Sequence, residues 1–80
     1  MPNEKIEVIA YSGYRGEETP RIIILHGKRI EVAGVLNRWI EEGSADRERK
    51  RFFNIKGSDG STHKIYYDEK VTEWYFVVED

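Results

Sequence analysis

An 80-residue chain with 39% hydrophobic and 35% charged residues is long enough for one folded domain and too apolar for a disordered one. Cysteine is absent, which excludes a disulfide framework, a thiolate nucleophile and the common structural zinc sites. The formal net charge of -2 provides no global field for polyanions, so a nucleic-acid site would have to be a local basic patch.

The first part of the chain predicts two strands separated by a long loop. Residues 1–4 are expected to fray, and apolar residues recur at every second position over residues 6–10, as in a half-buried strand. Residues 11–20 contain two glycines, end in proline and keep no period, which indicates a loop. Residues 22–25 are apolar on both faces, as in a strand covered on both sides.

A tight hairpin is expected next. Gly27 and Lys28 fit the two central positions of a type II′ turn, because glycine readily adopts the positive φ that the first position needs. This register sets Leu25 opposite Ile30 and gives the hairpin one aliphatic face.

Residues 33–42 leave two interpretations open. Their apolar side chains fall at helical spacing, and Gly43 suits a helix C-cap. A strand is favoured, because no N-cap residue precedes Val32, Gly34 would lie in the first helical turn, and β-branched residues and tryptophan are frequent here. In the strand interpretation, Ala33 and Gly34 form a bulge that bends it.

The turns of the last part of the chain set the register of three strands. A three-residue loop at 58–60, with a glycine bulge, places Phe52 opposite Tyr66 and puts the remaining apolar residues on one face. A four-residue loop at 69–72 then places Tyr75 opposite Tyr66. Phe52, Tyr66 and Tyr75 are therefore predicted to cross three neighbouring strands on the face away from the core.

These elements predict an all-β protein: a single domain, residues 1–80, in which five or six antiparallel strands form a meander that curls into a small SH3-like barrel. The alternative is an α+β fold with one short helix at about residues 32–42.

The predicted outer face carries most of the candidate binding residues. Its aromatic row resembles a stacking platform for unpaired bases, but the N-terminal strand or residues 29–39 could instead pack over it. The candidates on or leading into this face are Phe52, Tyr66, Tyr75, Lys64, Arg49, Lys50 and Arg51.

Tyr14 and Arg15 form a second candidate site. Glycines on both sides let the backbone bend around an aromatic and an arginine, which are side chains enriched at binding hot spots. An aromatic lid over the barrel end is the alternative role for this loop.

Catalysis and metal binding find little support. His26 and His63 lie in different hairpins without neighbouring ligands, and His63 is expected to be a hydrogen-bonded structural histidine. The serines are typical turn residues, and the carboxylates are typical solvated groups. We expect no enzyme activity, no cofactor and no metal.

Several motifs carry a resemblance that covers nearly the whole chain. They are Thr-Pro-Arg (19–21), Gly-Lys-Arg-Ile-Glu-Val (27–32), Val-Leu-Asn-Arg-Trp (35–39), Phe-Asn-Ile (53–55), Asp-Gly (59–60), Tyr-Tyr-Asp (66–68) and Glu-Trp-Tyr (73–75). With them the chain resembles an uncharacterised small domain found in stand-alone bacterial proteins and at the C-terminus of ImuB-type relatives of the Y-family translesion polymerases. The resemblance implies a bacterial setting and an accessory role in the DNA-damage response, and it brings no catalytic residue.

Two functions are therefore expected in order. The first is a non-catalytic interaction module that binds a protein partner, and the second is a weak binder of single-stranded nucleic acid that uses the aromatics and the local basic patch.

The start of the chain lacks a signal-peptide pattern and its longest aliphatic run is far too short to cross a bilayer, so we expect a cytoplasmic protein without membrane contact. An exposed edge strand would allow a monomer or a weak dimer.

Overall fold

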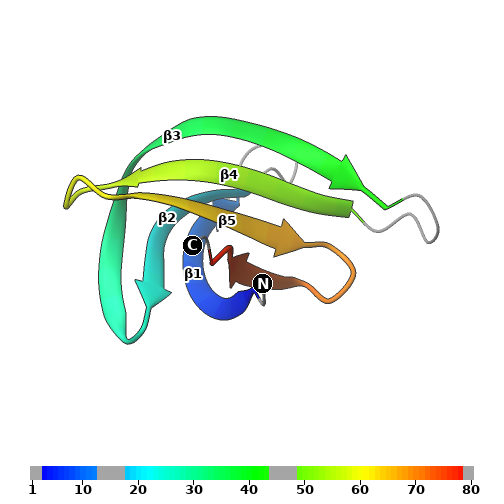
Figure 1. The fold of residues 1–80 in the computed structure, drawn as a ribbon, viewed down its shortest axis with the longest axis horizontal. Helices are drawn as coiled ribbons and strands as arrows, with labels where there is room; N and C mark the ends of the chain where they lie inside the picture. Colours follow the sequence, from blue (N-terminus) through cyan, green and yellow to red (C-terminus); the bar gives the residue numbers. More distant parts are fainter. Residues whose placement is uncertain (1–2, 13–17, 44–48, 79–80) are drawn as a thin grey trace.

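The structure is a computed structural model that describes residues 3–12, 18–43 and 49–78. These residues form an all-β fold in which consecutive strands pair antiparallel and close into a small SH3-like barrel (Figure 1). The strands are β1 (Glu4–Ser12), β2 (Glu18–Leu25), β3 (Lys28–Glu42), β4 (Arg49–Gly57), β5 (Thr62–Asp68) and β6 (Glu73–Phe76). The predicted meander is confirmed. The alternative helix is wrong, because β3 runs through its whole span.

The long strand β3 explains how the meander closes. Its first residues, 28–31, pair with β2, and residues 32–42 pair with β4. Register shifts mark two bulges, one at Ala33 and one at Leu36. Bulges bend a strand and increase its twist, so β3 can pass from one side of the barrel to the other, which Figure 1 shows as a long arc. The bulge predicted at Ala33 and Gly34 is confirmed.

The β2–β3 hairpin differs from its prediction. The central turn residues are His26 and Gly27, with φ of 53° and 75°, and Leu25 pairs with Lys28. Positive φ at both positions defines a type I′ turn, whose twist matches that of the flanking strands. The predicted Gly27-Lys28 turn was wrong because His26 takes the left-handed conformation. The register moves by two residues, so Ile23 faces Ile30 and the aliphatic face is kept.

Both C-terminal hairpins have the predicted register. Phe52 pairs with Tyr66 across a three-residue loop, in which Gly60 has a φ of 87°. Tyr66 pairs with Tyr75 across the following loop. The lengths of the loops at 58–60 and 69–72 therefore place the side chains of three strands correctly.

The barrel interior is filled by the inward side chains of all six strands. Ile23, Ile55 and Ile65 are fully buried. The other buried members of the core are Ile6, Leu25, Ile30, Phe53 and Trp74.

The N-terminal residues help to close the barrel. Glu4 pairs with Phe76 of β6, and the Asn3 side-chain amide donates to the Tyr66 hydroxyl at 3.0 Å. Asn3 and Glu4 therefore belong to the fold, so the expectation that they fray is wrong, whereas residues 1–2 lie outside the described residues. Over the described ranges, no helix is long and apolar enough to span a membrane.

Candidate binding face

Four aromatic side chains stand side by side across four neighbouring strands. Trp39 of β3 pairs with Phe52, which pairs with Tyr66, which pairs with Tyr75. Their ring centroids are 5.3, 4.9 and 5.1 Å apart in that order, with interplanar angles of 8°, 33° and 19°. We call these four residues the aromatic row. Its three predicted members are brought together as expected, and Trp39 extends it.

The aromatic row lies on the outer face of the sheet. The neighbouring residues Phe53, Ile65 and Trp74 belong to the core cluster, and side chains alternate between faces along a strand. Phe52 and Tyr66 are nevertheless only 8% and 6% exposed.

This burial has a simple cause. Each of the two central rings has an aromatic neighbour on both sides, so ring faces meet each other and mainly ring edges meet the solvent. An open stacking platform is therefore not what the row forms. The expected cover by another segment takes a different form as well: Trp39, from residues 29–39, packs beside Phe52 rather than over the face.

Two lysines hold their ammonium groups over the row. Lys64 Nζ lies 5.4 Å from the Trp39 ring centroid and 5.7 Å from that of Phe52. Lys50 Nζ lies 5.7 Å from the Tyr66 ring centroid. These distances bring both ammonium groups within cation–π range of the ring centroids, so the outer face combines aromatic rings with positive charge.

The predicted basic patch is divided between the two faces of β4. Lys50 shares the outer face with the aromatic row, whereas Arg49 and Arg51 alternate to the opposite face. Arg49 forms an ion pair with Glu42 at 3.6 Å, and Arg51 forms one with Glu69 at 2.5 Å. The structure therefore brings Lys50 and Lys64 to the row, and not the two arginines.

Polar contacts fix the Tyr75 end of the row. Lys5 Nζ lies 2.8 Å from Glu73 Oε1, and the Tyr75 hydroxyl donates to Glu73 Oε2 at 3.3 Å. The hydrogen bond from Lys5 lowers the pKa of Glu73, and the same contact raises the pKa of Lys5. Desolvation, with the Glu73 charge added, raises the pKa of Tyr75. At the other end, the Trp39 indole donates to Glu41 at 2.9 Å.

Tyr14 and Arg15, the second candidate site, lie outside the described residues. Trp39 is the residue that sequence reasoning did not assign to the face. Its helical spacing left open whether it belonged to a strand, and its face depends on how many bulges precede it in β3.

A hydrogen-bonded cluster at the β4–β5 turn contains the residue types of a catalytic triad. The Ser61 hydroxyl donates to Asp59 Oδ1 at 2.5 Å, so His63 Nε2 must be the donor in its 2.8 Å contact with Ser61 Oγ. The serine lies between the carboxylate and the imidazole, whereas an activated nucleophile needs the imidazole in the middle. The order carboxylate, hydroxyl, imidazole is that of a hydrogen-bonded turn network. His63 is hydrogen-bonded, as expected.

The same turn network affects the acidity of its carboxylate. The Ser61 hydroxyl and the Ser61 backbone N–H both donate to Asp59, and these hydrogen bonds lower the pKa of Asp59. Among the described residues, no group of three His, Asp or Glu side chains could hold a metal ion.

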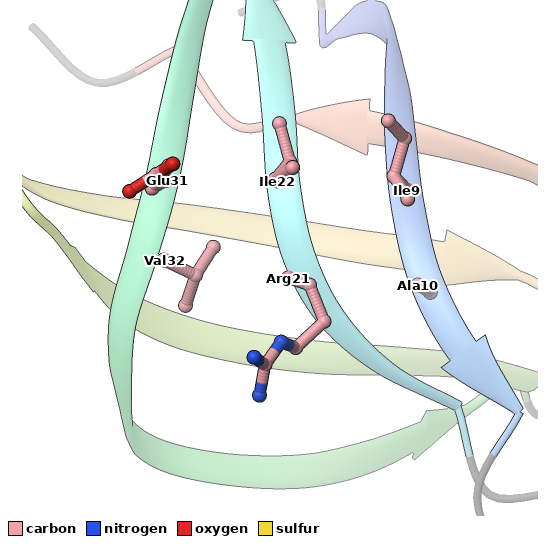
Figure 2. Close-up of a pocket in the computed structure, with 6 residues that line it drawn as sticks. All are labelled: Ile9, Ala10, Arg21, Ile22, Glu31 and Val32. Carbon is pink, nitrogen blue, oxygen red and sulfur yellow. The ribbon is translucent and has the colours of Figure 1, made fainter.

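A shallow hollow of about 320 Å³ lies where β3 separates from β2 (Figure 2). Figure 2 shows the side chains of Arg21 and Val32 lying between these two strands. The hollow is lined by Ile9, Ala10, Arg21, Ile22, Glu31 and Val32. This lining combines aliphatic groups with one cation and one anion, and it does not place a nucleophile next to a general base. The outer face therefore remains the stronger candidate.

Comparison of the chain with protein-family models, with curated proteins and with solved structures found no match.

Proposed function

We propose that this chain is a non-catalytic interaction module that binds a protein partner through the outer aromatic face. The observation that carries the proposal is the self-stacked aromatic row, in which Phe52 and Tyr66 are held rigidly and show mainly their edges. Rigid aromatic groups lose little conformational entropy on binding, and aromatic residues are enriched at the centres of protein interfaces.

The lysines add specificity to this surface. Lys50 and Lys64 lie over the rings, and the ends of the row carry the acidic residues Glu41 and Glu73. A central apolar strip with charged groups around it fits the usual arrangement of a protein interface, which has an apolar core and a polar rim. We further propose an accessory role in the bacterial DNA-damage response, which rests on the resemblance to the ImuB-type domain.

Binding of single-stranded nucleic acid is the second candidate, and the two lysines favour it. The aromatic row disfavours nucleic-acid binding, because base stacking needs open ring faces and the rings of Phe52 and Tyr66 already face their neighbours. The ion pairs of Arg49 and Arg51 speak against it too, since both cations point away from this face.

A photo-crosslinking experiment tests the proposal. A benzophenone amino acid at exposed Lys56, on the same face of β4 as Phe52, is expected to capture a defined protein from a lysate of the source organism. The same probe at exposed Arg29 of β3 is the matched control. Capture at Lys56 should persist at moderate salt and weaken when Tyr75→Ala is added. Equal capture from both positions, or capture unaffected by Tyr75→Ala, would contradict the proposal.

A further inference from the structure

Among the described residues, no strand pairs with residues 32–42 of β3 on the side away from β4, so this edge of β3 is free within residues 3–12, 18–43 and 49–78. The strand β3 pairs with β2 only up to Glu31, whereas β4 follows its other side from Val32 to Glu42. Figure 1 shows this part of β3 as the outermost strand, with β4 on one side and no strand on the other. The backbone N–H and C=O groups of such an edge can pair with a further strand.

Only part of this edge is regular. The bulges at Ala33 and Leu36 interrupt the strand, while residues 37–42 keep an unbroken register with β4. Within this regular stretch, Ile40 is 50% exposed, although it is a large apolar residue. Arg38 is exposed and has no ion pair among the described residues. The stretch therefore presents both apolar surface and an exposed cation.

We propose that two copies of the chain form a dimer by antiparallel pairing of this stretch, about a twofold axis at Ile40. In this register, Ile40 lies opposite Ile40 of the second copy. Arg38 lies opposite Glu42 of the second copy, and Trp39 lies opposite Glu41. Because a twofold interface is isologous, the Arg38–Glu42 pair occurs twice. The sheet of one copy continues into that of the other.

The charges of the stretch select this register over its neighbours. Facing residues must lie on the same face of the continuous sheet, so the axis can pass only through a residue. An axis at Glu41 or at Arg38 would set two like charges directly opposite each other, which is destabilising. An axis at Trp39 would leave Arg38 opposite Ile40. Only the axis at Ile40 forms two ion pairs and one apolar pair.

The ion pair of Glu42 within the chain does not block this arrangement. Glu42 lies 3.6 Å from Arg49, and the two side chains are 63% and 43% exposed. An exposed pair of this kind contributes little to stability, so the Glu42 carboxylate can also accept the guanidinium of a second copy. The dimer surface is separate from the outer aromatic face except at Trp39 and Glu41, and failure of the dimer proposal would leave the proposed function untouched.

Charge exchange tests the register. The wild-type chain is expected to dimerise in sedimentation experiments over concentrations up to about 1 mM, as a weak and small interface would. Arg38→Glu alone and Glu42→Arg alone should each weaken the dimer by about tenfold or more, because each creates two like-charge pairs. A mixture of the two variants should associate again, because both cross pairs are then opposite in charge. This recovery also shows that each variant is folded.

Cysteine crosslinking gives a second, independent readout, since the chain has no cysteine of its own. Under mild oxidation, Ile40→Cys should form a disulfide dimer, because residues opposite each other across two strands approach within disulfide reach. Arg38→Cys alone should not, whereas a mixture of Arg38→Cys and Glu42→Cys should. A wild-type chain that stays monomeric at about 1 mM would overturn the proposal. A dimer that is not weakened by Arg38→Glu or by Glu42→Arg would overturn it as well.

Discussion

Replacement of Phe52 by alanine tests whether the aromatic row is a structural part of the outer face. Phe52 is 8% exposed and stacks on Trp39 and Tyr66. Phenylalanine-to-alanine changes at buried sites cost about 3–5 kcal/mol, including the lost packing, and an aromatic pair contributes about 0.5–1.5 kcal/mol beyond its buried area. We therefore expect Phe52→Ala to lower the free energy of unfolding by about 3 kcal/mol, a large share of the roughly 4–12 kcal/mol of a domain this size.

Urea denaturation followed by circular dichroism measures this change. Ile9→Ala is the matched control, because Ile9 is 49% exposed, and it should lose less than about 1 kcal/mol. A double-mutant cycle of Phe52→Leu with Tyr66→Leu should give a coupling of about 0.5–1.5 kcal/mol. A loss below about 1 kcal/mol for Phe52→Ala would refute the reasoning, because an open ring on the surface would behave in that way.

Three further changes test the turns and the row ends. In Gly57→Ala, the new Cβ would lie 2.7 Å from Asp59 Oδ1 and 2.9 Å from Ile30 Cγ2, so the free energy of unfolding should fall by about 1–3 kcal/mol. Gly34→Ala has open space at its Cβ and should change this free energy little. Denaturation midpoints compare the two variants. The lowered pKa of Asp59 contributes stability that is present above the unfolded pKa of 3.8 and is lost as the pH falls through the folded pKa. Asp59→Asn removes this contribution, so the variant should lose less stability on acidification than the wild-type chain. Urea midpoints measured between neutral and acid pH check this. Tyrosinate absorbance should show Tyr75 ionising above its usual value of 10.0, and Glu73→Gln should bring that pKa back down, since the Glu73 charge contributes to the shift; an unchanged titration would contradict this cause.

The sequence predicts the C-terminal strands well because their turns are explicit. The glycine of the 58–60 loop and its length fix the register of β4 and β5, and every facing pair follows from it. The β2–β3 turn could not be assigned in the same way. His26-Gly27 and Gly27-Lys28 are both acceptable central pairs, and only the three-dimensional strand twist selects the one with a left-handed histidine.

The face of Trp39 shows why the candidate site could be predicted only in part. A single bulge before Trp39 would turn its side chain to the inner face, and a second bulge returns it to the outer one. Gly34 indicates the first bulge, but nothing in the sequence marks the second at Leu36. Sequence alternation also places Phe52 and Tyr66 on the outer face without showing that their rings bury one another, because alternation defines the face and not its exposure.

An amide NMR titration with a short single-stranded oligonucleotide tests most directly the claim that the outer aromatic face is closed to base stacking, which separates the proposed protein-binding function from its alternative. At low salt and about 1 mM ligand, we expect no saturable shifts of the Trp39 indole or of the Tyr66 and Tyr75 amides, and at most small, salt-sensitive shifts near Lys50 and Lys64. Saturable shifts along the aromatic row that weaken steeply between low and moderate salt would contradict the claim and establish a nucleic-acid-binding face.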